Sequence, residues 1–297
     1  MRVNPNPLPD LLAALGNNQQ LINTDTQELA SGLRINVPSD NPAGAAELVQ
    51  NAAQTSTDDQ FLRSIGSIQA ELQTSDSALN SVTTLLQRAI TLGTEGSSST
   101  VNASDRLALA AEAQGIQSQL VGLANLSYQG KYVFAGTATE APPYALSAAS
   151  PSGVTYAGNS GVNSVTVGEG FSVQTNLPGS ELFSNPSNDV FQAVEDLITN
   201  LQSGDVAGIS VAVGEVTSAS SYIDAQRVFY GNTLNQLGAQ QTFLNSATTQ
   251  LAQQENTIGG ADLPAVITNL ESAQVSRQAT LEALAQTQQT NLFNYIK

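Results

Sequence analysis

The chain has 297 residues, with 25 acidic residues, nine basic residues and a net charge of −16. So few basic residues argue against binding to nucleic-acid phosphates, and the acidic balance argues against docking on anionic lipid. The chain contains no cysteine and no histidine. It can therefore form no disulfide and no thiolate metal site, and it lacks the usual metal ligand and the usual general base.

The remaining composition favours helices. Aromatic residues make up 5% of the chain and charged residues 11%. The apolar residues are mostly Ala, Leu, Val and Ile, and the polar remainder is Gln, Asn, Ser and Thr. This mixture is typical of long helices that pack along apolar seams and turn uncharged polar faces toward other chains.

The N-terminal segment lacks the apolar stretch of a signal peptide, and no run of eighteen apolar residues occurs in the chain. We therefore expect neither a cleaved secretory signal nor insertion into a membrane. A chain without cysteine can be exported unfolded, although it can equally remain in the cytosol.

The first predicted helix carries apolar residues at steps of seven, which is the period of a coiled-coil seam. This helix leads into the stretch "SGLRINVPSDNPAGAAEL" at residues 31–48. Gly32 can end a helix, and Asn41 followed by Pro42 can start the next one, with Ser39 or Asp40 as alternative caps. The stretch therefore predicts a corner between two helices. The seam of the first helix consists of Leu8, Leu15, Ile22 and Leu29.

Three further repeats of seven residues follow, at 61–89, 109–123 and 209–258. The last would be a rod of roughly 75 Å if it forms a single helix. The pair Gly259-Gly260 is expected to end this rod. A final helix is predicted from about Leu263 to Tyr295, and its expected seam consists of Ile267, Leu270, Leu281, Leu284 and Leu292.

Between the helices, residues 130–183 are rich in Gly, Ser, Thr and Val, with short alternating runs and frequent turn residues. They predict a small β-rich insert, after which the helical pattern resumes near residue 188. A helix with one apolar seam is unstable alone in water, so the two helical halves of the chain must pair.

We therefore predict a mainly α fold, a long antiparallel helical bundle or coiled coil built from both chain ends with a small β-rich outer domain inserted in mid-chain. Residues 1–40 and 259–297 would form terminal helices. Residues 41–129 and 187–258 would form the long helical bundle, and residues 130–186 the outer insert.

No group of residues points to catalysis. Asp58 and Asp59 are adjacent carboxylates without a His, Cys or basic partner, and they are expected on a solvated helix face. Tyr128, Tyr132 and Phe134 gather where the helices meet the insert, which predicts a small core at the domain boundary or, alternatively, a ligand pocket. We predict no catalytic residue, no cofactor and no metal site.

Several stretches resemble the flagellin superfamily. "SGLRI" at 31–35 and "SDNPAG" at 39–44 are similar to its helix corner, and "LEALAQTQQTNLFNYI" is similar to its terminal helix. "MRVNPN", "YQGKYVFAGTATEAPPY" at 128–144 and "NLFNYI" resemble the hook-associated protein 3 branch, which joins hook to filament. The resemblance implies a joint motif of Gly32, Arg34, Asp40, Asn41, Pro42 and Gly44, and a start of the outer domain marked by Gly130, Tyr132, Phe134 and Gly136.

The resemblance also implies a location and partners. Such proteins leave the cell through the flagellar type III apparatus without a cleaved signal, helped by an export chaperone. They assemble with copies of themselves between hook-associated protein 1 and flagellin, and the paired terminal helices form the inner tube. The implied assembly residues are Leu8, Leu15, Ile22, Leu29, Leu281, Leu284, Leu292 and Phe293.

We further expect both ends to be mobile in the free monomer and to become ordered on contact with neighbouring subunits. Two other functions stay open. The first is filament flagellin, and the second is an intracellular coiled-coil adaptor. Adaptors of this kind usually carry dense Glu and Lys beside the seam, which is not the case here.

Overall fold

The computed structural model describes the backbone of residues 8–295 and the side chains of residues 8–287. The chain divides into two compact units. The first unit combines both chain ends, up to residue 57 and from residue 246 onward, and the second comprises residues 58–245. Mainly helical structure with a small β-containing region in mid-chain confirms the predicted fold class.

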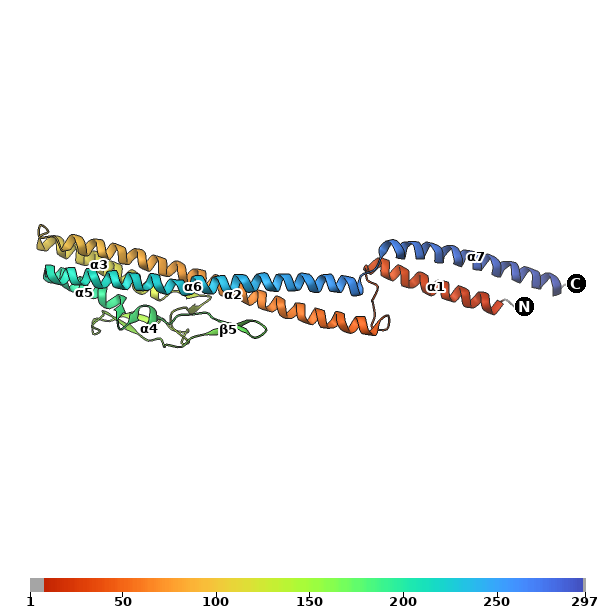
Figure 1. Cartoon of the computed structure of the whole chain (residues 1–297), viewed down its shortest axis with the longest axis horizontal. Coiled ribbons are helices and arrows are strands. Elements are labelled where there is room, and N and C mark those ends of the chain that lie inside the picture. The colour runs from red at the N-terminus through yellow and green to blue at the C-terminus, as the bar shows by residue number, and fades with distance from the viewer. Residues whose placement is uncertain (1–7, 296–297) are drawn as a thin grey trace. The chain divides into compact units, whose positions relative to one another are not determined.

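The first unit contains two terminal helices, α1 (Leu8–Ser31) and α7 (Leu263–Tyr295), which pack against each other (Figure 1). They run antiparallel, since Asn18 donates a hydrogen bond to Ser276 at 3.1 Å and Leu33 forms a bridge with Gly260. The start of α2 (Pro42–Gly96) and the end of α6 (Val206–Gly259) complete this unit.

The second unit is built on the rest of α2 and α6 together with α3 (Ala103–Ala124) and α5 (Val190–Ser203). The seven-residue repeats of α2, α3 and α6 and the apolar face of α5 supply a common core, which explains why such sparsely aromatic helices pack. A representative set of its fully buried side chains is Leu72, Leu79 and Leu86 of α2, Leu120 of α3, Leu197 and Leu201 of α5, and Val216 and Ile223 of α6.

Helix α6 confirms the predicted rod, since a single helix of 54 residues spans the fourth repeat. Among the described residues it is also the one helix that is long and apolar enough to cross a membrane by length and composition. Its apolar residues Ile209, Val216 and Ile223 are fully buried within the second unit, as in the core helix of a bundle.

The insert consists of four separate two-stranded antiparallel ladders and no larger sheet among the described residues. A lone two-stranded ladder is marginal in water, so these hairpins depend on packing against the helices. The paired strands are β1 (Ser127–Tyr128) with β2 (Lys131–Tyr132), β3 (Tyr144–Leu146) with β4 (Val154–Tyr156), β5 (Ser164–Gly168) with β6 (Phe171–Gln174), and β7 (Ser184–Asn185) with β8 (Asn188–Asp189); the short α4 (Gly179–Leu182) precedes β7.

An aromatic cluster connects the insert to the helices. The ring of Phe134 lies 5.2 Å from that of Phe183 in an edge-to-face arrangement, and the ring of Tyr144 lies 5.0 Å from that of Phe191 on α5. Such pairs contribute about 0.5–1.5 kcal/mol beyond the area that they bury. Burial raises the pKa of the Tyr144 phenol far above its usual value.

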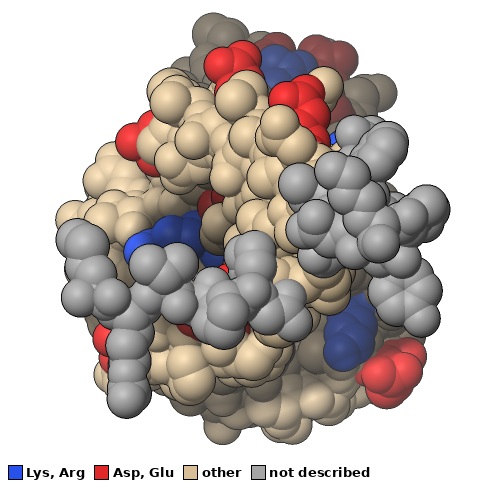
Figure 2. All heavy atoms as spheres, turned by 90° about the vertical axis from the view of Figure 1, so that its right-hand side faces the viewer, with Lys and Arg blue, Asp and Glu red and all other residues tan. Residues whose placement is uncertain are grey.

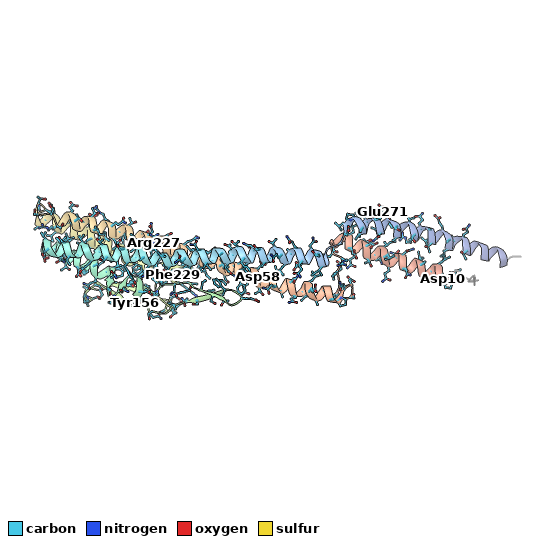
Figure 3. All side chains as sticks on the ribbon, in the orientation of Figure 1. Asp10, Asp58, Tyr156, Arg227, Phe229 and Glu271 are labelled. Carbon is cyan, nitrogen blue, oxygen red and sulfur yellow. The ribbon has the colours of Figure 1, made fainter. Side chains whose placement is uncertain are left out.

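One expectation for the helix surface was wrong. Asp58, labelled in Figure 3, was expected on a solvated face. Only 3% of it is exposed, whereas its neighbour Asp59 is exposed. Asp58 falls on the seam of α2, where the apolar repeat is interrupted, because Ile65 and Leu72 continue the same face at steps of seven.

Candidate assembly site

The α1 side of the terminal pair is only partly buried. Leu8, Leu15 and Ile22 are half-buried in the unit, and Leu29 is exposed. Asn18 and Asp25 lie on the same face, and Asp25 is the most buried residue of the helix. A carboxylate in this position is costly to bury, so the seam is weaker than its four apolar residues suggest.

The α7 side uses a face that coincides only in part with the one predicted. Ile267 and Leu281 are 44% and 45% exposed, so they lie outside the intramolecular seam, although Leu270 and Leu284 are half-buried within it. Val266 and Ala273 are buried instead. Each precedes by one residue a position of the expected seam, 267 and 274. The side chains of Leu292 and Phe293 lie outside the described residues. The face turned toward α1 comprises Val266, Leu270, Ala273, Arg277, Thr280 and Leu284.

This pairing leaves large apolar side chains in solvent. Leu12 and Leu21 of α1 and Ile267, Val275 and Leu281 of α7 are all exposed. Burial of each would contribute roughly 1.5–3 kcal/mol, and few charges would have to be desolvated with them. In the space-filling view, most of the visible surface is uncharged, with separate acidic and basic side chains (Figure 2). The helix pair thus offers a surface suited to association.

The joint after α1 is held by backbone hydrogen bonds. Gly32 has a φ of +70° and its N–H donates to the carbonyl of Glu28, which ends α1. The Arg34 N–H donates to the carbonyl of Gly259 at 2.7 Å, and its guanidinium donates to that of Ile258 at 2.7 Å. A cation at the end of α6 also suits the negative end of the helix dipole.

The start of α2 is defined by two neighbouring side chains. Asn41 caps the helix, since its Oδ1 accepts a hydrogen bond from the Gly44 N–H at 3.0 Å, and Pro42 is the first helical residue. Asp40 instead accepts from the backbone N–H groups of Asn36 and Val37, both at 3.0 Å. These bonds shape the loop before the helix.

Gly44 is needed for close packing within the joint. A Cβ atom there would lie 2.7 Å from Cδ1 of Ile35 and 3.0 Å from the Asn41 side chain. The structure therefore brings Gly32, Arg34, Asp40, Asn41, Pro42 and Gly44 together at one corner of the first unit.

The residues at the start of the outer domain have separate roles. Gly130 has a φ of +80° and follows Gln129, with a φ of +48°, in the two-residue turn between β1 and β2. Positive φ at both positions is the type I′ hairpin turn. Phe134 is fully buried in the aromatic cluster and Tyr132 is half-buried. Gly136 has a φ of +73°.

The sequence did not point to the polar clamp between α2 and α6. Arg227, labelled in Figure 3, lies on α6. It donates two hydrogen bonds to the Asp76 carboxylate, at 2.9 and 3.3 Å, and a third to Asn80 at 3.1 Å. Thr83 adds a bond to Asp224 at 3.1 Å. Their only signal in the sequence is an arginine on an otherwise weakly charged helix.

Two parts of the chain match flagellin families. Residues 9–139 match the bacterial flagellin N-terminal helical region, and residues 213–296 match the bacterial flagellin C-terminal helical region. Together these parts cover more than two thirds of the chain. The chain therefore belongs to the bacterial flagellin family, whose members are structural components of the flagellum. This membership gives no support to an intracellular adaptor.

Individual relatives refine this family. Flagellar hook-associated protein 3 of Salmonella typhimurium is 32% identical over 119 residues, which are 40% of this chain and 38% of that protein. The match thus spans less than half the length of that relative. Flagellin of Listeria innocua is 25% identical over 277 residues, 90% of this chain and 88% of that protein.

A solved structure shares the fold. The flagellar junction protein FlgL of Legionella pneumophila superposes with a TM-score of 0.61 at 15% identity, over 72% of this chain and all of that chain. The similarity concerns the arrangement of the helices and the insert.

Proposed function

We propose that this protein is a flagellar junction protein of the hook-associated protein 3 type, which joins hook to filament through its terminal helices. The observation that carries the proposal is the α1–α7 pair, with a polar-interrupted seam and exposed Leu12, Ile267, Val275 and Leu281. The similarity to hook-associated protein 3 of Salmonella typhimurium supports the junction position.

In this proposal, residues 1–40 and 259–297 of neighbouring subunits form the inner tube and cover one another's exposed apolar side chains. Hook-associated protein 1 would lie on one side of the layer and flagellin on the other, and residues 130–186 would face solvent. The chain would be exported without a cleaved signal, bound to an export chaperone. A weak helix pair in the free monomer would delay polymerisation until the subunit reaches the growing structure.

Immunogold electron microscopy of isolated flagella tests the proposal, with an antibody raised against residues 145–183 of the insert. The expected result is label at a single position, where hook meets filament. A strain that lacks the gene serves as the control for antibody specificity. Signal inside cells with none on flagella would overturn the proposal.

Filament flagellin is the second candidate. The similarity to the flagellin of Listeria innocua extends over nearly the whole chain, and it favours this alternative. In that case the same antibody would label the filament along its length, and the protein would be the most abundant chain in sheared filaments.

A further inference from the structure

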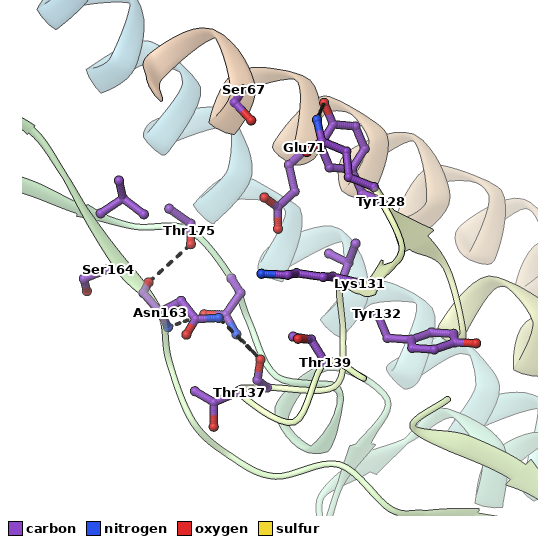
Figure 4. Close-up of a pocket in the computed structure, with 15 residues that line it drawn as sticks. Ser67, Glu71, Tyr128, Lys131, Tyr132, Thr137, Thr139, Asn163, Ser164 and Thr175 are labelled. Atoms are coloured by element: carbon purple, nitrogen blue, oxygen red, sulfur yellow. Dashed lines mark hydrogen bonds between the residues drawn. The ribbon is translucent and has the colours of Figure 1, made fainter. Parts of the chain in front are cut away.

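A pocket of about 500 Å³ lies in the second unit, between α2, the β1–β2 hairpin and the strand β5 (Figure 4). Its volume falls within the roughly 300–1,000 Å³ of small-molecule sites. The assembly role proposed above makes no use of it. Its position matches the boundary where the sequence places Tyr128 and Tyr132.

One wall of the pocket is rigid because its polar groups are already hydrogen-bonded within the protein. Asn176 is 2% exposed, and its Oδ1 accepts from the Asn163 N–H at 2.6 Å. The Asn176 amide donates to the Gly161 carbonyl at 3.2 Å, and the Asn163 carbonyl accepts from the Thr175 N–H at 2.9 Å. This wall is built before any ligand arrives.

Five other polar side chains of the lining have unused hydrogen-bonding capacity. Ser67 and Glu71 lie four residues apart on one face of α2, and Lys131, Thr139 and Ser164 approach from the insert (Figure 4). Among the described residues, none of these five side chains makes an intramolecular hydrogen bond or ion pair. Three separate segments thus direct donors and acceptors into one cavity, where a ligand rich in hydroxyl groups could satisfy them.

The charges of the pocket favour a neutral ligand. Glu71 and Lys131 are its two charged residues, and their opposite charges cancel. Burial raises the pKa of the Glu71 carboxyl, while the Lys131 ammonium partly opposes this increase. A single lysine would not hold a phosphate in a chain with a net charge of −16, and acidic polymers would be repelled.

The apolar part of the lining is small and includes an aromatic face. Val133 and Val165 are the aliphatic residues of the lining, too few for an apolar ligand. The half-buried ring of Tyr128 lies beside Glu71 at the rim (Figure 4). The aromatic ring can contact the C–H face of a sugar. The neighbouring carboxylate and hydroxyl side chains can at the same time form hydrogen bonds with the hydroxyl groups of that sugar.

We propose that this pocket binds a neutral saccharide unit, whose hydroxyl groups donate to Glu71 and accept from Lys131 while its C–H face packs on Tyr128. Ser67, Thr139 and Ser164 would complete the hydrogen bonds. The inference is independent of the position of the protein in the flagellum, so neither proposal depends on the other.

Saturation-transfer difference NMR and titration calorimetry on the 297-residue chain test this site, with maltose, cellobiose and N,N′-diacetylchitobiose as probes. We expect at least one of them to bind. Glu71→Gln removes a charged acceptor but keeps the shape, so it should weaken binding about tenfold or more. Lys131→Met should have a similar effect, whereas Asp59→Asn, an exposed carboxylate on the same helix, should have none.

Circular dichroism verifies that each variant is folded before its affinity is compared. Absence of binding by all three probes at millimolar concentration would overturn the proposal. So would binding that both Glu71→Gln and Lys131→Met leave unchanged. Glycine is tested in parallel, and if it binds at the same residues while the sugars do not, the pocket recognises a zwitterion and the saccharide assignment is wrong.

Discussion

Among single residues, Asp189 caps the N-terminus of α5 although its surroundings raise the pKa of its carboxyl. Its Oδ1 accepts a hydrogen bond from the Gln192 N–H at 2.9 Å at the start of α5. Burial nevertheless raises the pKa of its carboxyl, and the nearby Asp196 adds to the increase. The carboxylate is useful here as an acceptor, whereas its charge is a cost.

Substitutions of Asp189 should therefore separate the two effects. Asp189→Ala loses the cap and should lower the free energy of unfolding by about 0.5–2 kcal/mol, whereas Asp189→Asn keeps an acceptor and should be neutral or stabilising at pH 7. Because the folded-state pKa is raised, the stability linked to Asp189 is present at low pH and lost as pH rises through that pKa. In urea unfolding between pH 4 and 7, the free energy of unfolding should therefore change less with pH in Asp189→Asn than in the unchanged protein. Equal destabilisation by Asn and Ala would contradict this account.

Gly136 and Gly130 form a matched pair for testing backbone requirements. Both have positive φ, but a Cβ at Gly136 would lie 2.2 Å from the carbonyl oxygen of Asn159, whereas nothing lies near one at Gly130. Gly130→Ala should cost only the roughly 1–2 kcal/mol of a left-handed alanine, and Gly136→Ala clearly more. Limited proteolysis of the insert would compare them, and equal resistance of the two variants would count against the steric argument.

At the scale of elements, the α1–α7 pair combines an apolar repeat with polar interruptions. Asp25 is buried in the face of α1 that packs on α7. Arg277 occupies a seam position of α7 with a polar side chain, which donates a hydrogen bond to Gln19 at 3.2 Å. The exposed apolar residues lie elsewhere on both helices. The pair is therefore marginal alone, which fits helices that must rearrange or be covered during assembly.

Replacement of Asp25 should strengthen this pair. Asp25→Leu removes a buried carboxylate and adds apolar area, so amide hydrogen exchange across residues 8–31 of the free monomer should slow. Gln27→Leu is the control, since Gln27 is exposed and the same apolar group there should protect the helix much less. Unchanged exchange in Asp25→Leu would show that this carboxylate does not weaken the pair.

At the scale of the whole molecule, the proposed role requires exposed apolar residues that matter for assembly and not for the monomer. Leu281 is such a residue, since it is 45% exposed and lies outside the intramolecular seam. Leu281→Asp should leave the circular dichroism and thermal unfolding of the monomer nearly unchanged. It should abolish polymerisation and the motility that the gene restores to a deletion strain.

The matched control is Val211→Asp, which adds the same charge at an exposed position of α6 in the second unit. It should polymerise and restore motility normally. If Leu281→Asp assembled as well as the unchanged protein, the α7 face would not be an assembly surface. If it failed to fold, the seam described above would be incorrect.

The sequence alone determined the local features of this protein. The repeat from Ile209 to Ile258 lies within one helix, α6, and Gly32, Asn41 and Gly259 end or begin helices as expected. These features depend on periodicity, on backbone φ and on caps that reach only a few residues along the chain. The resemblance to the flagellin superfamily also depends on short stretches, such as "SGLRI" near one end of the chain and "NLFNYI" near the other.

Which helix faces meet depends on tertiary contacts. Val266 and Ala273 pack toward α1, whereas Ile267 and Leu281 are exposed. Asp58 is buried. The insert forms separate hairpins around an aromatic cluster, and a polar pocket lies beside Glu71. Neighbouring faces of a helix with similar apolar content compete, and contacts between segments far apart in the chain choose between them.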